Sequence, residues 1–138
     1  MKNYLVYYQH YVSAHRHWKF KMLRSGYGWA GEGKFWALNN LIAASDNAIL
    51  DLSKKPVLAS AADELDFTLD EFIDFIGYLS AECELITFVD NKVTTDICRD
   101  NLHEVMKTRE KAQMRRNRDL EKKFENEQEK FPKLLQKF

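Results

Sequence analysis

The sequence lacks any run of about 18 consecutive apolar residues, which is the length that a membrane-spanning helix needs. Residues 1–12 also lack the long apolar core of a secretory signal peptide. Cysteine is scarce, since the only two, Cys83 and Cys98, show neither CxxC spacing nor the framework of a secreted domain. We therefore expect reduced thiols in a cytoplasmic protein that makes no membrane contact.

The net charge is zero, but the basic and acidic residues are distributed unevenly along the chain. Residues 1–45 carry six Lys or Arg and one acid, residues 46–100 carry four and thirteen, and residues 101–138 carry eleven and seven. Charge divided in this way indicates separate faces for separate partners. The composition, 45% hydrophobic and 13% aromatic, still allows a buried core. We expect a domain at residues 1–105 and a charged helical extension at residues 106–138.

Side-chain groupings that would indicate catalysis are missing too. His10, His15 and His17 lie close together in the sequence, but no neighbouring cysteine or acid completes a metal site. Cys83 is flanked by two glutamates, Glu82 and Glu84, which disfavour a reactive thiolate. We therefore expect no enzyme, no bound metal and no cofactor.

A glycine-rich stretch is the one local pattern that resembles a nucleotide site. Residues 28–34 have the spacing of a Walker A loop, but Phe35 replaces the Ser or Thr that holds magnesium. The dinucleotide pattern at Gly26, Gly28 and Gly31 likewise lacks its preceding strand. We favour a turn between two helices, in which glycines allow positive φ and close packing.

The apolar spacing predicts a mainly α fold with a small β-hairpin. One buried helical face is predicted in residues 35–42 from Phe35, Trp36, Leu38, Leu41 and Ile42. A second helix is expected over residues 54–65. Thr68 and Glu71 form a capping-box signature for a third, which ends near Ala81 and buries Leu69, Phe72, Ile73, Ile76 and Leu79.

Short strands are expected on either side of these helices. Residues 47–52 are predicted as one strand, and residues 85–90 and 93–96 as a hairpin around a turn at Asn91 and Lys92. Two helices followed by a hairpin predict a winged helix-turn-helix. A long C-terminal helix follows it, over about residues 97–130.

The N-terminal segment is rich in aromatic residues. Residues 3–12 predict a strand or an extended arm, and we take Tyr4 and Tyr8 as candidates for protein interaction. Residues 15–24 predict one or two helical turns with Trp18, Met22 and Leu23 inward and with Lys19, Lys21 and Arg24 in solvent.

The acids of the third helix decide where nucleic acid is able to bind. No Lys or Arg lies between residues 68 and 84, so phosphates should be repelled there, and Asp70, Glu71 and Asp74 become candidates for protein interaction. The candidate nucleic-acid contacts are instead Lys107, Arg109, Lys111, Arg115, Arg116 and Arg118, with Lys92 at the wing tip. A merely solvated helix surface is the open alternative.

The last part of the chain has a broken heptad pattern. Leu120, Phe124, Phe131, Leu134 and Phe138 fall at a and d positions, interrupted by Glu127 and Pro132. The pattern indicates a short dimer contact or an adhesive end, rather than a long coiled coil.

Residues 7–41 resemble the opening of a domain family of phage and prophage replication proteins related to the N-terminal winged-helix domain of the primosomal protein DnaD. The resemblance, which extends in element order over about residues 4–105, is carried by Tyr7, Tyr8, His10, Lys19, Leu23, Arg24, Tyr27, Gly28, Gly31, Gly33, Phe35, Trp36 and Leu38. Tyr11 departs from it, because an Asp is expected there. The resemblance implies replication initiation or primosome assembly, with self-association rather than base readout. The downstream DNA-binding domain of such proteins is not evident, which indicates a fragment or a shortened member.

Three hypotheses follow from the sequence. The favoured one is a non-enzymatic winged-helix module of a phage-type replication initiation or primosome protein, which forms homo-oligomers, docks replication proteins and contacts DNA without sequence preference. The alternative is a winged-helix regulator of transcription that reads a specific DNA site, against which the acid-only helix argues. A nucleotide-binding enzyme rests on the near-match at residues 28–34 alone.

Overall fold

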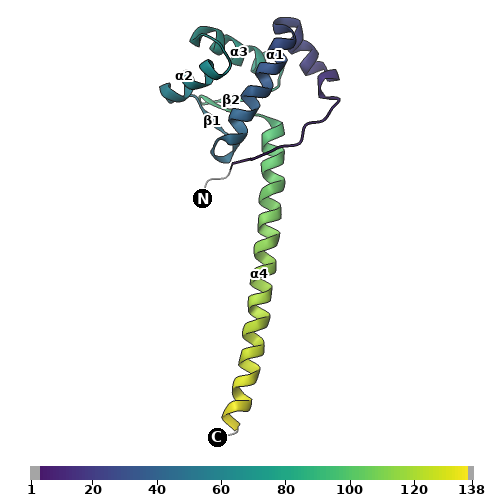
Figure 1. Ribbon diagram of the computed structural model, residues 1–138, viewed down its shortest axis with the longest axis vertical. Helices are drawn as coiled ribbons and strands as arrows, with labels where there is room; N and C mark the ends of the chain where they lie inside the picture. Colours follow the sequence, from purple (N-terminus) through teal and green to yellow (C-terminus); the bar gives the residue numbers. More distant parts are fainter. Residues whose placement is uncertain (1–3, 137–138) are drawn as a thin grey trace. The chain divides into compact units, whose positions relative to one another are not determined.

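The computed structural model describes the backbone of residues 4–136 and the side chains of residues 4–127. The chain divides into two units, Met1–Leu102 and His103–Phe138. The predicted mainly helical α+β class is confirmed, since several helices accompany a small antiparallel sheet (Figure 1). The elements in chain order are η1 (Ala14–Arg16), α1 (Trp18–Ala44), η2 (Asp46–Ala48), β1 (Leu50–Asp51), α2 (Lys55–Glu64), α3 (Leu69–Ala81), β2 (Thr87–Val89), β3 (Lys92–Thr94) and α4 (Asp96–Gln136).

Helix α1 consists of two helical arms that meet at Gly28. This glycine has φ 69° and ψ −169°, a backbone conformation outside the helical region. Gly26 lies against the ring of Tyr78, where an added Cβ would come within 2.7 Å of the ring carbon Cζ. The predicted turn between two helices, with positive φ and close packing at glycines, is therefore confirmed. Residues 29–34 are helical, so they do not form the loop that a Walker A motif requires.

Helices α1 and α3 contribute most of the buried residues in the core of the first unit. Phe35, Leu38 and Ile42 are fully buried, as predicted. The first arm of α1 contributes Phe20 and Leu23 instead of Trp18 and Met22, which are 51% and 39% exposed. The predicted burial of Leu23 is confirmed, but that of Trp18 and Met22 was wrong, because the buried face of this arm is the one that carries Phe20 and Leu23.

Arg24 was also predicted in solvent, and this was wrong. Its guanidinium Nη1 lies 2.9 Å from Glu32 Oε2, and both side chains are mostly buried between the two arms of α1. The guanidinium also lies over the ring of Trp29, 4.3 Å from the ring centroid. The pair therefore links the two arms across the bend.

Helix α3 begins with the predicted capping box. The Thr68 hydroxyl accepts a hydrogen bond from the backbone N–H of Glu71, and the Glu71 carboxylate accepts one from the N–H of Thr68. Phe72, Phe75, Ile76 and Leu79 are buried on one face of this helix. The predicted burial of Leu69 and Ile73 was wrong, because the two side chains are 47% and 51% exposed.

The sheet has the strand order β1-β3-β2, and both pairs are antiparallel. Asp90 and Asn91, with φ 53° and 61°, form the hairpin turn, and Lys92 begins β3. The turn predicted at Asn91 and Lys92 was therefore one residue too late. The strand predicted over residues 47–52 is shorter than expected, because η2 occupies Asp46–Ala48.

A buried polar cluster joins the start of α4 to α1. The Thr95 hydroxyl donates a hydrogen bond to Asn39 Oδ1 at 2.6 Å and accepts one from the backbone N–H of Cys98 at 3.1 Å. All three residues are at most 1% exposed. The hydroxyl thus caps the first turn of α4 while it bonds to α1.

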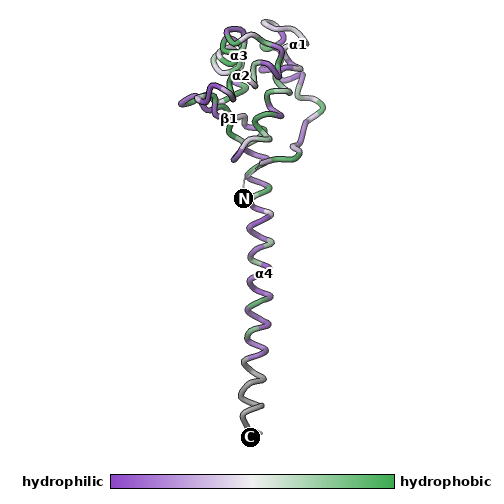
Figure 2. The backbone as a smooth tube through the Cα atoms, turned by 60° about the vertical axis from the view of Figure 1, so that its left-hand side comes forward, coloured by the Kyte–Doolittle hydropathy of each residue, from purple (hydrophilic) through white to green (hydrophobic). Residues whose placement is uncertain are grey.

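The second unit is helical, and its sequence is hydrophilic along most of its described length (Figure 2). The backbone of α4 runs through Pro132 to Gln136. The heptad positions Phe131 and Leu134 lie outside the described side chains, and Phe138 lies outside the described residues altogether. Within the part of the chain that is described, no helix is both long and apolar enough to cross a bilayer.

Candidate nucleic-acid and protein interfaces

The basic residues of α4 do not form a single surface. Helix periodicity of about 100° per residue places five of them within an arc of about 80°. We call this set the basic stripe: it consists of Lys107, Lys111, Arg115, Arg118 and Lys122, at successive spacings of three or four residues. All five side chains are exposed. Three of them also border one shallow depression of about 300 Å³, namely Arg115, Arg118 and Lys122.

The other predicted contacts, Arg109 and Arg116, lie on the opposite side of α4. Arg116 precedes Leu120 by one helical turn, and Lys123 follows Leu120 by three residues, so both basic side chains flank an apolar strip. That strip consists of Leu120 and Phe124, which are 64% and 61% exposed. Only part of the predicted basic set is therefore able to meet one phosphate backbone at the same time.

The candidate contact at the wing was placed wrongly. Lys92 is exposed, but it lies in β3 beside the turn rather than at its tip. The tip is Asp90 and Asn91, and it therefore carries an acid. The wing has no basic residue at the point where it would approach a phosphate.

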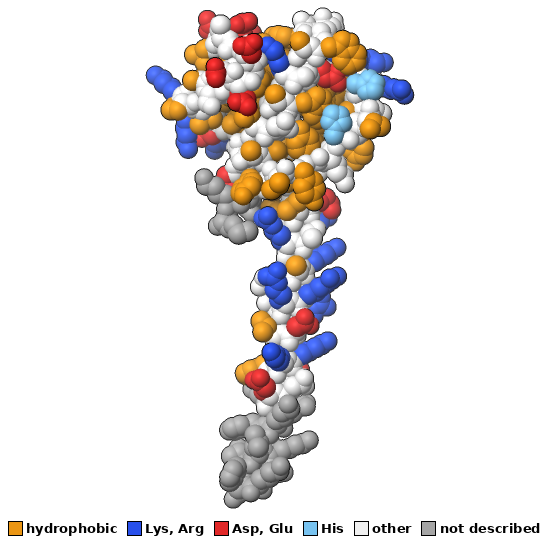
Figure 3. Space-filling model, in the orientation of Figure 1, with side chains coloured by type: hydrophobic (Ala, Val, Ile, Leu, Met, Phe, Trp, Pro, Cys, Tyr) orange, Lys and Arg blue, Asp and Glu red, His pale blue; other side chains and the backbone are white. Residues whose placement is uncertain are grey.

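The acidic candidates on α3 are exposed, as expected, but they have different roles. Hydrogen bonds from the backbone and side chain of Thr68 lower the pKa of Glu71, which serves the capping box. Asp70 and Asp74 remain on the outer face of the helix, one turn apart. These two carboxylates therefore form an acidic ridge on α3. In Figure 3, several acidic side chains gather over this part of the molecule.

The aromatic arm is extended, and Tyr8 packs against α1. The N–H of Leu5 donates to the carbonyl of Ala43 at 2.8 Å, and the Leu5 side chain is buried. Tyr8 stacks on Trp36 with ring centroids 6.4 Å apart, and its hydroxyl donates to Asn40 Oδ1. Tyr8 is therefore held against α1, and its role as a protein contact stays a prediction. Tyr4 is 51% exposed and remains accessible.

A groove between α3 and β2 was not predicted from the sequence. It has a volume of about 340 Å³ and is lined by Leu52, Leu58, Phe72, Ile73, Ile76, Gly77, Phe88 and Asn91. Ile73 and Phe88 are both substantially exposed at this α3–β2 groove. A Cβ added at Gly77 would meet no atom within 4 Å, so the helix backbone is open to close approach there. Large apolar side chains left in solvent in this way are typical of an interaction surface.

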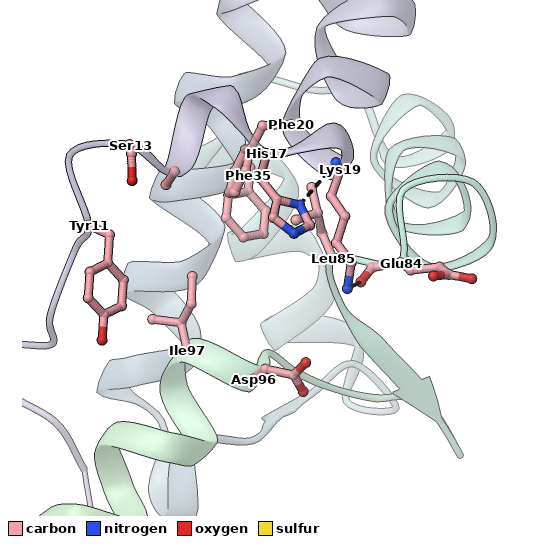
Figure 4. Close-up of a pocket in the computed structure, with 11 residues that line it drawn as sticks. Tyr11, Ser13, His17, Lys19, Phe20, Phe35, Glu84, Leu85, Asp96 and Ile97 are labelled. Atoms are coloured by element: carbon pink, nitrogen blue, oxygen red, sulfur yellow. Dashed lines mark hydrogen bonds between the residues drawn. The ribbon is translucent and has the colours of Figure 1, made fainter.

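A second groove lies between the first arm of α1 and the start of α4 (Figure 4). Its volume is about 350 Å³, and Phe20 and Phe35 form its apolar wall. At its edge the Lys19 ammonium donates to the backbone carbonyl of Glu84 at 3.0 Å, and the Lys19 N–H donates to His17 Nδ1. The Lys19 bond links the first arm of α1 to the segment that follows α3, so it holds two walls of the groove together.

His10, His17 and the two buried cysteines occupy structural positions. His10 lies over Trp36 with ring centroids 3.9 Å apart, and His17 caps α1. Burial, followed by the charge of Glu82, raises the pKa of the Cys83 thiol to about 11, in agreement with the predicted weak thiolate. Among the described side chains, those of residues 4–127, no cluster of three or more His, Cys, Asp or Glu is placed to hold a metal ion.

The chain was compared with protein-family models, with curated proteins and with solved structures, and none of these comparisons found a match.

Proposed function

We propose that this chain is a non-enzymatic winged-helix module of a phage-type DNA replication initiation or primosome protein. It docks proteins through its first unit and contacts nucleic acid without sequence preference through α4. The winged-helix assignment is supported by the element order α1-β1-α2-α3-β2-β3 and by the strand order β1-β3-β2, with a two-residue wing turn. The replication assignment is supported by the resemblance in residues 7–41.

The separation of charge between α3 and α4 carries the nucleic-acid part of the proposal. In a winged helix that reads DNA, the position of α3 is the one that enters the major groove. This α3 has three exposed acids and no Lys or Arg, so it would meet phosphates with like charge. The basic stripe has the opposite character, because its five exposed cations follow one side of a helix. Nucleic acid is therefore expected to bind α4 and to avoid α3.

Binding of this kind has a distinctive dependence on salt. Each neutralised phosphate releases condensed counterions, so log K falls with log salt by about 0.9 per contact on duplex DNA and by about 0.7 on single strands. Contacts to phosphates carry no sequence information directly. We therefore expect weak affinity at physiological salt, steep loss with added salt and no preferred sequence.

The test is fluorescence anisotropy of labelled single- and double-stranded DNA, titrated with the full chain over a range of salt concentrations. One variant removes three charges from the stripe: Lys111→Ala, Arg115→Ala and Arg118→Ala. A matched control removes three charges from the other side of α4: Arg109→Ala, Arg116→Ala and Lys123→Ala. All proteins are compared at concentrations at which they are monomeric, so that avidity does not enter.

The expected result is a salt slope that falls by about 2–3 in the stripe variant and stays near that of the wild type in the control. Equal losses in both variants would mean that overall charge, and not the stripe, attracts DNA. No binding even at low salt would remove nucleic acid from the proposal. A footprint at one defined duplex site would favour the alternative, a sequence-specific transcriptional regulator.

A further inference from the structure

We propose that the α3–β2 groove of one copy receives the apolar strip of α4 from a second copy, so that the chain assembles head to tail. This inference deepens the docking role proposed above by naming its partner. It concerns the face of α4 opposite the basic stripe, and therefore succeeds or fails independently of nucleic-acid binding.

The groove requires an occupant with apolar and basic side chains. Ile73 and Phe88 provide an open apolar surface, and Gly77 leaves space for a side chain to approach the backbone of α3. On α3, Asp70 lies three residues before Ile73, and Asp74 lies three residues before Gly77, so the acidic ridge runs beside the groove. An acidic or neutral partner would leave these carboxylates unpaired at a contact that excludes water.

The strip on α4 has this chemistry. Leu120 and Phe124 lie one turn apart, as do Ile73 and Gly77 on α3. Arg116 and Lys123 flank the strip on one side, in the way that Asp70 and Asp74 flank the groove, whereas Glu121 and Glu127 each lie three residues from Phe124. Both apolar side chains are about two-thirds exposed, so they have no cover within their own unit. The two surfaces therefore match in apolar spacing, and the side of the strip that carries Arg116 and Lys123 is opposite in charge to the acidic ridge.

The same features argue against a symmetric contact between two copies. Placing one groove against another would bring Asp70 and Asp74 of both copies together, and like charges at an interface disfavour it. A contact between two different surfaces leaves one groove and one strip open at the ends of every assembly. Such contacts add further copies as the concentration rises, unless the assembly closes into a ring.

Sedimentation velocity of the full chain over a range of concentrations tests this assembly. The groove variant is Ile73→Asp and the strip variant is Phe124→Asp, both at exposed positions where the fold should tolerate the change. The control is Val89→Asp, at a residue of β2 that is 61% exposed and does not line the groove. Circular dichroism confirms that each variant is folded.

Wild type and the Val89→Asp control are expected to form assemblies that grow with concentration and weaken with salt. Each of the other two variants should weaken association by at least about tenfold, the effect of losing a buried anchor at an interface. The decisive sample is an equimolar mixture of the two variants. The Ile73→Asp variant keeps an intact strip, and the Phe124→Asp variant keeps an intact groove. The mixture should therefore form a heterodimer and nothing larger.

Other outcomes would overturn the proposal. A wild-type chain that stays monomeric at all concentrations has no such contact. If Phe124→Asp abolishes association and Ile73→Asp does not, α4 pairs with α4. If the mixture fails to form a heterodimer while the wild type assembles, the groove and the strip are not partners. The stripe variant described above should assemble as the wild type does, whether or not it binds DNA.

Discussion

At the residue scale, Gly28 is the position where the backbone depends most on having no side chain. Its φ of 69° with ψ near −169° belongs to a region that is almost restricted to glycine. We expect Gly28→Ala to lower the free energy of unfolding by about 1–3 kcal/mol, measured by urea unfolding followed by circular dichroism.

Gly33 provides the matched control for this change. It lies in a helical part of α1, and a Cβ added there meets no atom within 4 Å. Gly33→Ala should therefore raise the free energy of unfolding by up to about 1 kcal/mol, because alanine favours helix. If the two substitutions changed stability in the same direction, the bend at Gly28 would not be the strained position that we describe.

Cys83 makes stability depend on alkaline pH. Burial raises the pKa of its thiol from the ordinary 9.0 to about 11 in the folded protein. The folded state therefore holds this proton more tightly than the unfolded state, and the stabilisation is complete below pH 9. The free energy of unfolding should fall as pH rises from 9 to 11.

Urea unfolding at a series of pH values, with Cys83→Ala as the comparison, measures this contribution. Cys98 contributes in the same direction, because burial also raises its pKa, so the substitution should reduce the alkaline loss rather than abolish it. An identical pH dependence in Cys83→Ala and wild type would contradict the assignment.

At the scale of elements, the wing turn is held by two residues with positive φ, Asp90 and Asn91. Both central positions of such a hairpin turn favour glycine or asparagine, and glycine most at the second. We expect Asn91→Gly to raise the free energy of unfolding by a few tenths to about 1 kcal/mol. Asn91→Ala should lower it by about 1–2 kcal/mol, because a Cβ is costly at positive φ. Thermal and urea unfolding of the pair would show opposite shifts if the turn is as described.

Several elements could be predicted because their signals are local. The capping box of α3 depends on Thr68 and Glu71 alone, and the buried face of α1 on the spacing of Phe35, Leu38 and Ile42. The hairpin was placed one residue out of register because asparagine suits either position of the turn, while the pairing of Val93 with Leu50 in β1 fixes the register. That pairing joins residues far apart in the sequence.

The candidate surfaces were harder to predict than the elements. Composition located the basic residues of α4, but their division into two faces follows from a continuous helix. The α3–β2 groove was missed because Ile73 fits the apolar period of α3 and was assigned to the core. The spacing of apolar residues shows the middle of the apolar face of a helix. How far burial extends on either side of that face depends on the tertiary packing. The stacking of Tyr8 on Trp36 was likewise not predicted, because Trp36 lies far along the chain.

At the scale of the whole molecule, the buried apolar residues are confined to the first unit. Among the described side chains, all of those that form the core lie at or before Leu102. A polypeptide of residues 1–102 should therefore unfold cooperatively, with a free energy of unfolding within about 0.5 kcal/mol of the full chain. Its urea m-value should also be similar, because m follows the surface exposed on unfolding.

The comparison should be made at concentrations where the full chain is monomeric, because assembly would add stability. A truncated polypeptide that is markedly less stable, or that unfolds without cooperativity, would mean that residues after Leu102 contribute to the core.

The Thr95 hydroxyl links the formation of helix α4 to the folding of the first unit. Forming the first turn is the unfavourable step of helix formation, with a nucleation constant of about 10⁻³. Each later residue then extends the helix at little cost in free energy. Thr95 fixes the first turn by capping Cys98 while it bonds to the buried Asn39, so the folded domain supplies the nucleus. The polar residues that follow only have to propagate it. The five cations of the basic stripe share one side only while α4 is helical, and the Thr95 hydroxyl stabilises the start of that helix. We therefore expect the stripe to lose its alignment when the domain unfolds.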